Sequence, residues 1–369
     1  MTISYPERHS ALTSRHVALG SKMDASWNGM PIPQNYASNP YDETVLVRTK
    51  AGLFDVTALQ IINVSGPDAM AVLNNLVTSD LAKISSGSSL ITSIVNDEGG
   101  IIDDVIIYVD SKTEFRVSHG GGTLEPVLMK DIVGHNVVAE RDDDVHILSL
   151  QGPLSGDILQ PHTELPLSSL SYFSHAQTTL FGKPVRIARG GYSGETGYEV
   201  FCTSEEAGPI WDMILEAGKS YGAAPVSWSC LDIVRLEGGL LFFPYDMPAE
   251  NTTPWEVNMG WSIDLQKTAF RGKKALEALR GQERSTIIGL EVLSKEAAEA
   301  GTPIFHDGVQ VGQVTSSIFS QYLMKSLAIA TIKPSLSAFG TAVSVGESAQ
   351  ANIVRMPFYD PLRLRTHPR

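Results

Sequence analysis

The sequence predicts an α+β protein in which two related α+β halves precede a small C-terminal β domain, either a barrel or a sandwich. Three observations predict this class. Strand-like and helix-like stretches are mixed without strict alternation, a strand–Gly–Pro–helix pattern occurs twice, and from about residue 284 only short β-like runs separated by turn residues remain. We therefore expect one α+β region over residues 1–278 and a separate β domain over residues 279–369.

The first half opens with the first copy of the repeated pattern. A strand is expected at 59–66, followed by a helix at 67–79 with Pro67 in its first turn. "SSLITSIVND" and "IIDDVIIYVD" flank Glu-Gly-Gly, which predicts a hairpin because glycines permit the turn. The strand "TEFRVSH" then ends at Gly120–Gly122 and a helix follows. The triple glycine favours a tight turn, although free N–H groups at the helix start could hold a carboxylate.

The second half repeats this order. Its strand and helix lie at 147–160, where "LQGP" corresponds to "VSGP" of the first copy. Two further strands are expected at 183–191 and 197–203, and helices near 208–222 and 229–241. The strands of the C-terminal domain are then expected at 285–293, 308–317, 326–332, 341–346 and 351–356.

Composition excludes several classes of function. The net charge of −13, from 28 basic and 41 acidic residues, disfavours nucleic-acid binding, which requires basic surface. No run of about 18 uncharged apolar residues occurs, so no membrane span is expected. The first residues lack the apolar core of a secretory signal. Only two cysteines occur, Cys202 and Cys230, which we expect in the core of a cytoplasmic protein.

Several site types lack their motifs. The nine histidines form no His-x-His or His-Glu-x-x-His pattern, and no Cys-x-x-Cys occurs, so no metal site is expected. "GGYSGE" around Ser193 lacks the spacing of a hydrolase nucleophile, and no glycine loop has a dinucleotide or phosphate pattern.

Two adjacent acids, Asp103 and Asp104, interrupt an apolar strand. Side chains alternate between the faces of a strand, so Asp104 shares a face with Ile106 and Tyr108, and Asp103 points the other way. The two carboxylates cannot readily face solvent at the same time. One of them is either at a strand end near water or buried with a partner, since an unpaired buried carboxylate is costly. A functional acid with a raised pKa and a structural or capping acid both remain open.

An ordered set of stretches resembles the folate-dependent aminomethyltransferase family, which includes the glycine cleavage T-protein and dimethylsulfoniopropionate demethylase. Each stretch alone is weak evidence, but together they run through almost the whole chain in the family's order. They are "HVALGSKM" (16–23), "VRTKAGLFDV" (47–56), "VSGPDA" (64–69), "NDEGGIIDDVIIY" (96–108), "LQGP" (150–153), "GYSGETGYEVF" (191–201), "RLEGGLLFFPYDM" (235–247), "FRGKKAL" (270–276) and "VGQVTSS" (311–317).

The resemblance implies three lobes around a central channel for tetrahydrofolate: the two α+β halves and a C-terminal β-barrel. It identifies Asp104 as the catalytic acid, places Glu199 at the polar edge of the pterin and Tyr192 in the same pocket. Arg365 would meet the folate tail, with Arg363 as the alternative because the register slips there. These assignments are chemically sound: a carboxylate accepts hydrogen bonds from a pterin, and an arginine binds a carboxylate tail.

The sequence also departs from the T-protein pattern, which indicates a rebuilt substrate pocket. The departures are Leu59, Ile91, Leu231 and His119, which replaces an asparagine. His119 either points into the channel to meet the substrate or is a satisfied histidine at a strand end. Trp255 could flank a cationic substrate together with Trp261, although core packing explains at least one of them equally well.

The leading hypothesis is a tetrahydrofolate-dependent demethylase, which moves a methyl or methylene group to N5 of the folate. The donor would be a small methylated amine, betaine, sulfonium or ether. The first alternative is a T-protein, but the charge of −13 does not favour docking of the acidic H-protein. The second is a folate-binding protein without activity, whose relatives carry a reactive cysteine that "LQKTAFRGKKAL" lacks.

Overall fold

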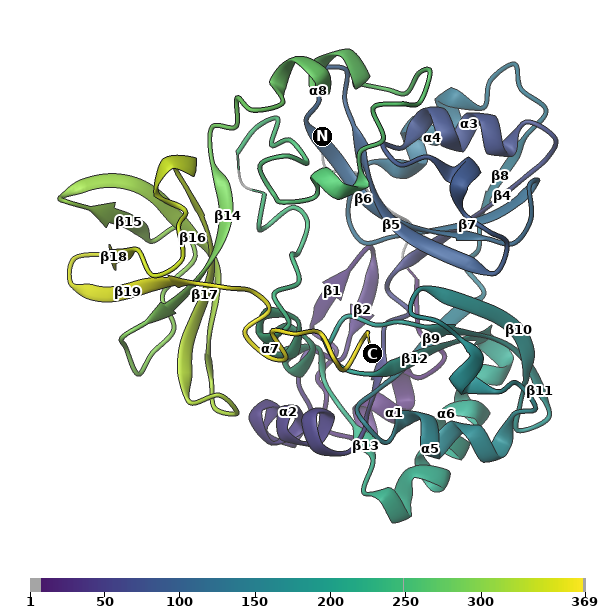
Figure 1. The fold of residues 1–369 in the computed structure, drawn as a ribbon. Helices are drawn as coiled ribbons and strands as arrows, with labels where there is room; N and C mark the ends of the chain where they lie inside the picture. Colours follow the sequence, from purple (N-terminus) through teal and green to yellow (C-terminus); the bar gives the residue numbers. More distant parts are fainter. Residues whose placement is uncertain (1–7, 248, 368–369) are drawn as a thin grey trace.

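A computed structural model describes residues 8–247 and 249–367 of the chain. Figure 1 shows three lobes: the barrel on the left, the first α+β half at the upper right and the second half below it. The C-terminal tail leaves the barrel and ends near the centre, between the lobes. No helix among the described residues is long and apolar enough to cross a membrane.

The two halves share one sheet of eleven strands, in the order β13-β3-β9-β12-β11-β10-β5-β6-β7-β4-β8. The halves join between β10 and β5 through a single residue pair, Ser174 and Ser88. The strands of the first half are β4 (Gln60–Ser65), β5 (Ser88–Val95), β6 (Ile101–Val109), β7 (Glu114–His119) and β8 (Val138–Arg141). Those of the second are β3 (Gly52–Asp55), β9 (Val145–Gln151), β10 (Ser174–Leu180), β11 (Lys183–Arg189), β12 (Gly197–Thr203) and β13 (Ala224–Pro225).

Helices cover the outer faces of this sheet and fill the junction with the barrel. The first half carries α3 (Ala69–Leu76) and α4 (Leu124–Asp131). The others are α1 (Thr13–Ala18), α2 (Pro40–Thr49), α5 (Ser155–Leu159), α6 (Ser204–Gly218), α7 (Trp228–Glu237) and α8 (Lys273–Leu279), and a separate ribbon is formed by β1 (Ala25–Trp27) and β2 (Met30–Ile32). The repeated sequence pattern corresponds to β4–α3 in the first half and β9–α5 in the second.

The C-terminal strands close into a barrel, as the family resemblance implies. Its order is β14-β17-β16-β15-β18-β19, and β14 closes the barrel by pairing with β19. The strands are β14 (Thr286–Val292), β15 (Pro303–His306), β16 (Val309–Ser320), β17 (Lys325–Ile332), β18 (Ala342–Val345) and β19 (Ala349–Val354).

Two predicted helices end earlier than expected: the helix expected near 229–241 is α7 and ends at Glu237, and the helix expected at 67–79 is α3. The helix expected at 67–79 spans Ala69–Leu76, so Pro67 lies outside it and Asp68 is its N-cap residue. Its C-terminus is fixed because Val77 is extended and bridges to Ile94 of β5. The buried ammonium of Lys267 then donates to backbone carbonyls in this region, at 2.7 Å from Val77 and 2.8 Å from Ser79.

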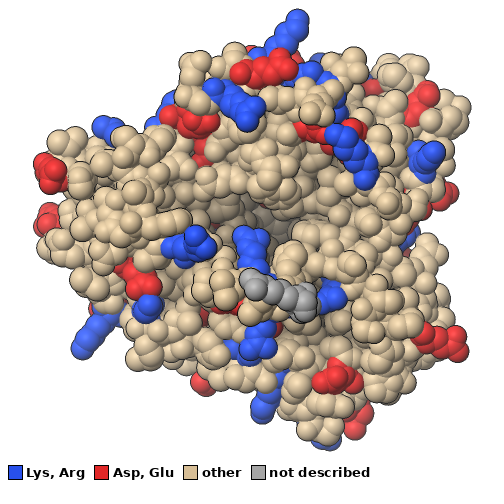
Figure 2. Space-filling model, in the orientation of Figure 1, with Lys and Arg blue, Asp and Glu red and all other residues tan. Residues whose placement is uncertain are grey.

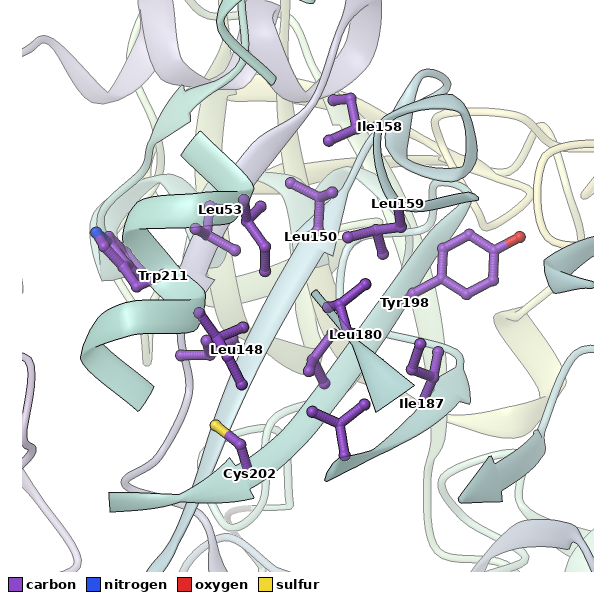
Figure 3. Close-up of a cluster of buried hydrophobic side chains, with 14 of the residues drawn as sticks. Leu53, Leu148, Leu150, Ile158, Leu159, Leu180, Ile187, Tyr198, Cys202 and Trp211 are labelled. Carbon is purple, nitrogen blue, oxygen red and sulfur yellow. The ribbon is translucent and has the colours of Figure 1, made fainter. Parts of the chain in front are cut away.

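Each half and the barrel have their own apolar core. Figure 3 shows the core of the second half, where Leu148 and Leu150 of β9 pack against Trp211 of α6. Cys202 lies in this core, and burial raises the pKa of its thiol to about 12. Cys230 is likewise buried and free, so both cysteines pack as small apolar residues.

Two buried ion pairs attach α7 to the rest of the molecule. Glu237 accepts from Arg48 of α2 at 2.8 Å and from Ser320 of β16 at 2.6 Å. Arg235 contacts Asp246 at 2.8 Å, and Asp246 also accepts from Ser316 of the barrel at 2.6 Å. These contacts fix the position of α7 between the sheet and the barrel.

Candidate functional site

Asp103 and Asp104 point to opposite faces of the sheet, as strand alternation predicts. Asp104 lies opposite Ser93 in β5, and Asp103 lies opposite Ile94. Asp103 is completely buried on the face that α3 and α4 cover. Asp104 is only partly buried and faces the space between the two halves, on the same side as Tyr108.

The carboxyl group of Asp104 lies in dense surroundings without a cationic partner among the described residues. It keeps some contact with solvent, so a ligand can reach it. Burial, followed by the negative charge of Asp103, raises its pKa from 3.8 to about 7. Burial also raises the pKa of Tyr192; the charge of Arg235 opposes this effect and the charge of Asp104 adds to it. Asp104 can therefore exchange a proton near neutral pH.

Glu199 of β12 is the second such acid, contributed by the other half of the sheet. The Tyr108 hydroxyl donates to it at 3.4 Å. Burial raises the pKa of Glu199 from 4.5 to about 7, and the bond from Tyr108 opposes this effect. Asp104 and Tyr108 are four residues apart on one face of β6, about 13 Å along the strand. Glu199 lies at the Tyr108 end of this face.

Most other buried carboxylates among the described residues have a cationic partner, and Glu43, which has none, accepts hydrogen bonds from Ser38 and from the N–H and hydroxyl of Ser227. Asp55 lies 2.9 Å from His16, and Glu256 lies 2.8 Å from Arg284. The Arg48–Glu237 and Arg235–Asp246 pairs follow the same rule. Against this background, Asp104 and Glu199 are unusual, because a buried acid without a cation is costly unless a ligand supplies hydrogen-bond donors.

Tyr192 and three predicted pocket residues surround the same space. The Tyr192 hydroxyl donates to the Leu241 carbonyl. Leu59 and Leu231 belong to the apolar cluster that contains Tyr192. Ile91 lies opposite Ile106, on the face of the sheet that carries Asp104. Leu59, Leu231 and Tyr192 thus share one apolar cluster, and Ile91 lies on the sheet face that carries Asp104.

The C-terminal tail supplies positive charge beside this space. Figure 2 shows a hollow where the three lobes meet, with Lys and Arg side chains along its lower edge. Arg365 is half exposed and lies 3.8 Å from Glu195. Burial and the charge of Glu199 raise the pKa of Tyr172, and the charge of Arg363 opposes this effect.

Two predicted pocket residues lie elsewhere. His119 is buried beside Asp103, on the face of the sheet opposite Asp104. Trp255 packs in a small cluster with Phe270, and its ring N–H donates to the Leu276 carbonyl at 3.0 Å. The cation over Trp255 is the chain's own Arg280, at 5.5 Å, while Trp261 is 69% exposed. The structure does not bring either tryptophan together with Asp104.

Tyr108 was not identified from the sequence as the hydrogen-bond donor to Glu199, although its position on the strand gave part of the information. Its place four residues after Asp104 puts it on the same face, but its contact with Glu199 depends on how the halves pack. The sequence also suggested that the N–H groups after the triple glycine could hold a carboxylate. In the structure this carboxylate is the side chain of Asp103, which accepts a hydrogen bond from the Leu124 N–H at 2.9 Å. Within the described part of the chain, no group of three or more metal-ligating side chains is assembled.

Comparison with known proteins agrees with this architecture. Residues 12–267 match the GCVT N-terminal domain, and residues 286–360 match the glycine cleavage T-protein C-terminal barrel domain. The crystal structure of the glycine cleavage system aminomethyltransferase T from Bartonella henselae superposes with a TM-score of 0.88 at 26% identity, covering 96% of this chain and 98% of that chain.

Two relatives match over almost their full length. The chain is 40% identical to the heme-dependent oxidative N-demethylase gamma subunit of Ectopseudomonas mendocina (strain ymp), over 96% of both chains. It is 32% identical to an aminomethyltransferase of Thermotoga neapolitana, over 95% of this chain and 98% of the relative.

Fold, domains and relatives together define a one-carbon transferase enzyme with three lobes. The chain belongs to the folate-dependent aminomethyltransferase family. The fold class and the family expected from the sequence are both confirmed.

Proposed function

We propose that the protein transfers a one-carbon unit from a small methylated amine to N5 of tetrahydrofolate. The observation that carries this proposal is the pair of partly buried acids, Asp104 and Glu199, which lack a cationic partner among the described residues. Each has a pKa raised to about 7, and both face the space between the halves. A reduced pterin presents amino and N–H groups that suit such acceptors.

The residues fit the cofactor that the family implies. Glu199, supported by Tyr108, would accept hydrogen bonds from the polar edge of the pterin. Tyr192 and Leu231 would form apolar walls that exclude water, and the arginines of the tail would bind the folate carboxylates. Tetrahydrofolate, when bound, supplies the nucleophilic nitrogen that accepts the one-carbon unit. Asp104 would orient the reacting groups and hold or release a proton beside them.

An amine is the favoured donor because the relative at 40% identity is named as a subunit of an N-demethylase. Two chemical routes are then possible. Direct methyl transfer is redox-neutral: the C–N bond of the donor breaks, the bond to N5 forms, and the N5 proton goes to the leaving amine. Methylene transfer requires prior two-electron oxidation of the methyl group, which an oxidising partner subunit would carry out. Betaine, sulfonium and ether donors are the competing outcomes.

The decisive experiment separates these routes. The protein is incubated with tetrahydrofolate and a panel of methylated amines, betaines, sulfonium salts and aryl ethers, and in a second arm with formaldehyde. The products 5-methyl- and 5,10-methylenetetrahydrofolate are separated by chromatography. Formaldehyde reacts with tetrahydrofolate spontaneously. The catalysed rate is therefore the wild-type rate minus the rate measured with Asp104→Asn. If no donor reacts faster with wild type than with this variant, the proposal is wrong.

The alternative function is that of a glycine cleavage aminomethyltransferase, which relatives such as that of Thermotoga neapolitana favour by name. Turnover with H-protein carrying an aminomethyl-lipoyl arm would establish it. The charge of −13 disfavours an acidic carrier as partner. The two free buried cysteines suit a reducing compartment, so we place the reaction in the cytoplasm.

A further inference from the structure

The first residue of the triple glycine leaves an open position beside Asp104. His119 ends β7 and lies opposite Val105 in β6, so Gly120 follows at the position opposite Asp104. Side chains at opposed positions of antiparallel strands point to the same face, with their Cβ atoms about 5 Å apart. A Cβ at Gly120 would lie 3.9 Å from the nearest atoms of non-adjacent residues in the described chain. The position can therefore hold one carbon-sized group in ordinary van der Waals contact.

Two side chains bound this position. Leu59 Cδ2 and the ring carbon Cζ2 of Trp27 each lie 3.9 Å from the Cβ position of Gly120, and the Trp27 ring nitrogen lies 4.0 Å from it. Leu59 packs in the same apolar cluster as Ile106, which shares a strand face with Asp104. This contact shows, independently of the strand register, that the open position is on the Asp104 side of the sheet.

The ring of Trp27 is held firmly against the glycine run. Trp27 ends β1 directly before the two-residue turn Asn28–Gly29, whose φ angles of 50° and 72° are those of a type I′ hairpin turn. Its ring packs against Phe242, with the ring centroids 4.9 Å apart. A Cβ at Gly121 would lie 3.0 Å from the same ring, so the glycine there allows this close approach. A ring fixed in this way acts as a wall.

We propose that the position beside Gly120 is the subsite for the transferred one-carbon group, and that Leu59 and Trp27 exclude larger groups from it. The inference rests on the proposed function for the place of the reacting atoms beside Asp104. A methyl or methylene group occupies the space that a Cβ would occupy. The second carbon of an ethyl group would meet Leu59 or the indole ring. Neither wall carries a charge, so the selection is by size, and N-methyl donors are preferred to N-ethyl donors.

Binding of two folates, without any donor, tests this subsite. Isothermal titration calorimetry of the full chain compares tetrahydrofolate with 5-methyltetrahydrofolate, which carries the one-carbon group on the reacting nitrogen. Wild type should bind the two within about threefold. Gly120→Ala fills the subsite and should weaken binding of the methylated folate by about 10-fold or more, while tetrahydrofolate stays within about twofold. Gly156→Ala, whose Cβ would lie in ordinary contact 3.6 Å from Tyr198, should change neither affinity.

Removing one wall should reverse the effect. In Gly120→Ala/Leu59→Ala, most of the affinity for 5-methyltetrahydrofolate relative to tetrahydrofolate should return, because the alanine at position 120 no longer crowds the methyl group. In turnover assays, wild type should prefer an N-methyl amine to its N-ethyl counterpart by about 10-fold or more in kcat/KM. Leu59→Ala alone should reduce this preference.

Two results would overturn the inference. One is an unchanged ratio of the two folate affinities in folded Gly120→Ala. The other is a wild-type protein that binds the methylated folate more than about 10-fold more weakly than tetrahydrofolate, since no room for the methyl group would then exist. Failure of the proposed function is distinguishable: wild type would bind both folates without turning over any donor, and the affinity ratios would still decide the subsite. Binding of neither folate would refute both.

Discussion

Tyr108 of β6 and Glu199 of β12 are hydrogen-bonded at 3.4 Å, although three strands separate β6 from β12 in the sheet. In a flat sheet, strands this far apart would be about 19 Å from each other. The sheet is therefore folded over, and the single residue pair Ser88–Ser174 that joins β5 to β10 is the place where it bends. This folding brings the inner faces of the two halves together and gathers the acids Asp104 and Glu199 around one space.

Replacing Glu199 tests its assigned contact with the pterin. Glu199→Gln should weaken tetrahydrofolate binding by about 10- to 100-fold, because one charge-assisted hydrogen bond is replaced by a neutral contact. Tyr108→Phe should have a smaller effect, since its bond to Glu199 is long. Isothermal titration calorimetry at pH 8 measures both. Glu205→Gln, on the exposed surface of α6, is the control; equal affinities for Glu199→Gln and this control would remove Glu199 from the site.

Asp104→Asn should abolish turnover, leave folate binding largely intact and stabilise the protein in alkaline conditions. Folding raises the pKa of Asp104 from 3.8 to about 7, so the native state keeps a proton that the unfolded chain has released. Stability therefore falls as pH rises through this window. The variant lacks this penalty and should be more stable by on the order of 1–3 kcal/mol at pH 8.

Urea unfolding across the pH range checks this expectation. The difference between Asp104→Asn and wild type should shrink as the pH falls and vanish below about pH 4, where both side chains are neutral. A constant difference at every pH would show that the substitution acts through packing and not through the proton.

Much of this arrangement was accessible from the sequence, because it depends on local pattern. Strand alternation alone put Asp103 and Asp104 on opposite faces, and the hairpin, the repeat and the short C-terminal strands follow from periodicity and turn residues. The closure of those strands into a barrel was implied by the family resemblance. Contacts that depend on the fold of the sheet were not accessible, such as that of Tyr108 with Glu199. The direction of His119 was also left open, because it depends on the register of β7 with β4 and β6, which no local pattern specifies.

The triple glycine provides a matched pair of substitutions. A Cβ at Gly122 would lie 2.1–2.4 Å from the carboxyl atoms of Asp103, whereas at Gly120 the nearest atoms are 3.9 Å away, in Leu59 and Trp27. Neither glycine has a positive φ, so alanine is compatible with the backbone at both. Gly122→Ala should therefore cost about 1–3 kcal/mol by displacing Asp103, and Gly120→Ala should change stability by less than about 0.5 kcal/mol. Similar unfolding midpoints in urea for the two variants would contradict the close contact.

The buried pair of Arg48 and Glu237 should dominate the attachment of the barrel to the sheet. Arg48→Met leaves Glu237 charged and buried with only hydrogen bonds such as that from Ser320, which should cost about 3–5 kcal/mol. The double variant Arg48→Met/Glu237→Leu removes both charges and should recover part of this loss. Lys219→Met, which breaks an exposed contact of 4.0 Å with Glu216, should stay within about 0.5 kcal/mol of wild type. Thermal unfolding of wild type and the three variants measures these differences. A double variant less stable than Arg48→Met would mean that packing, and not the uncompensated charge, governs the stability of this junction.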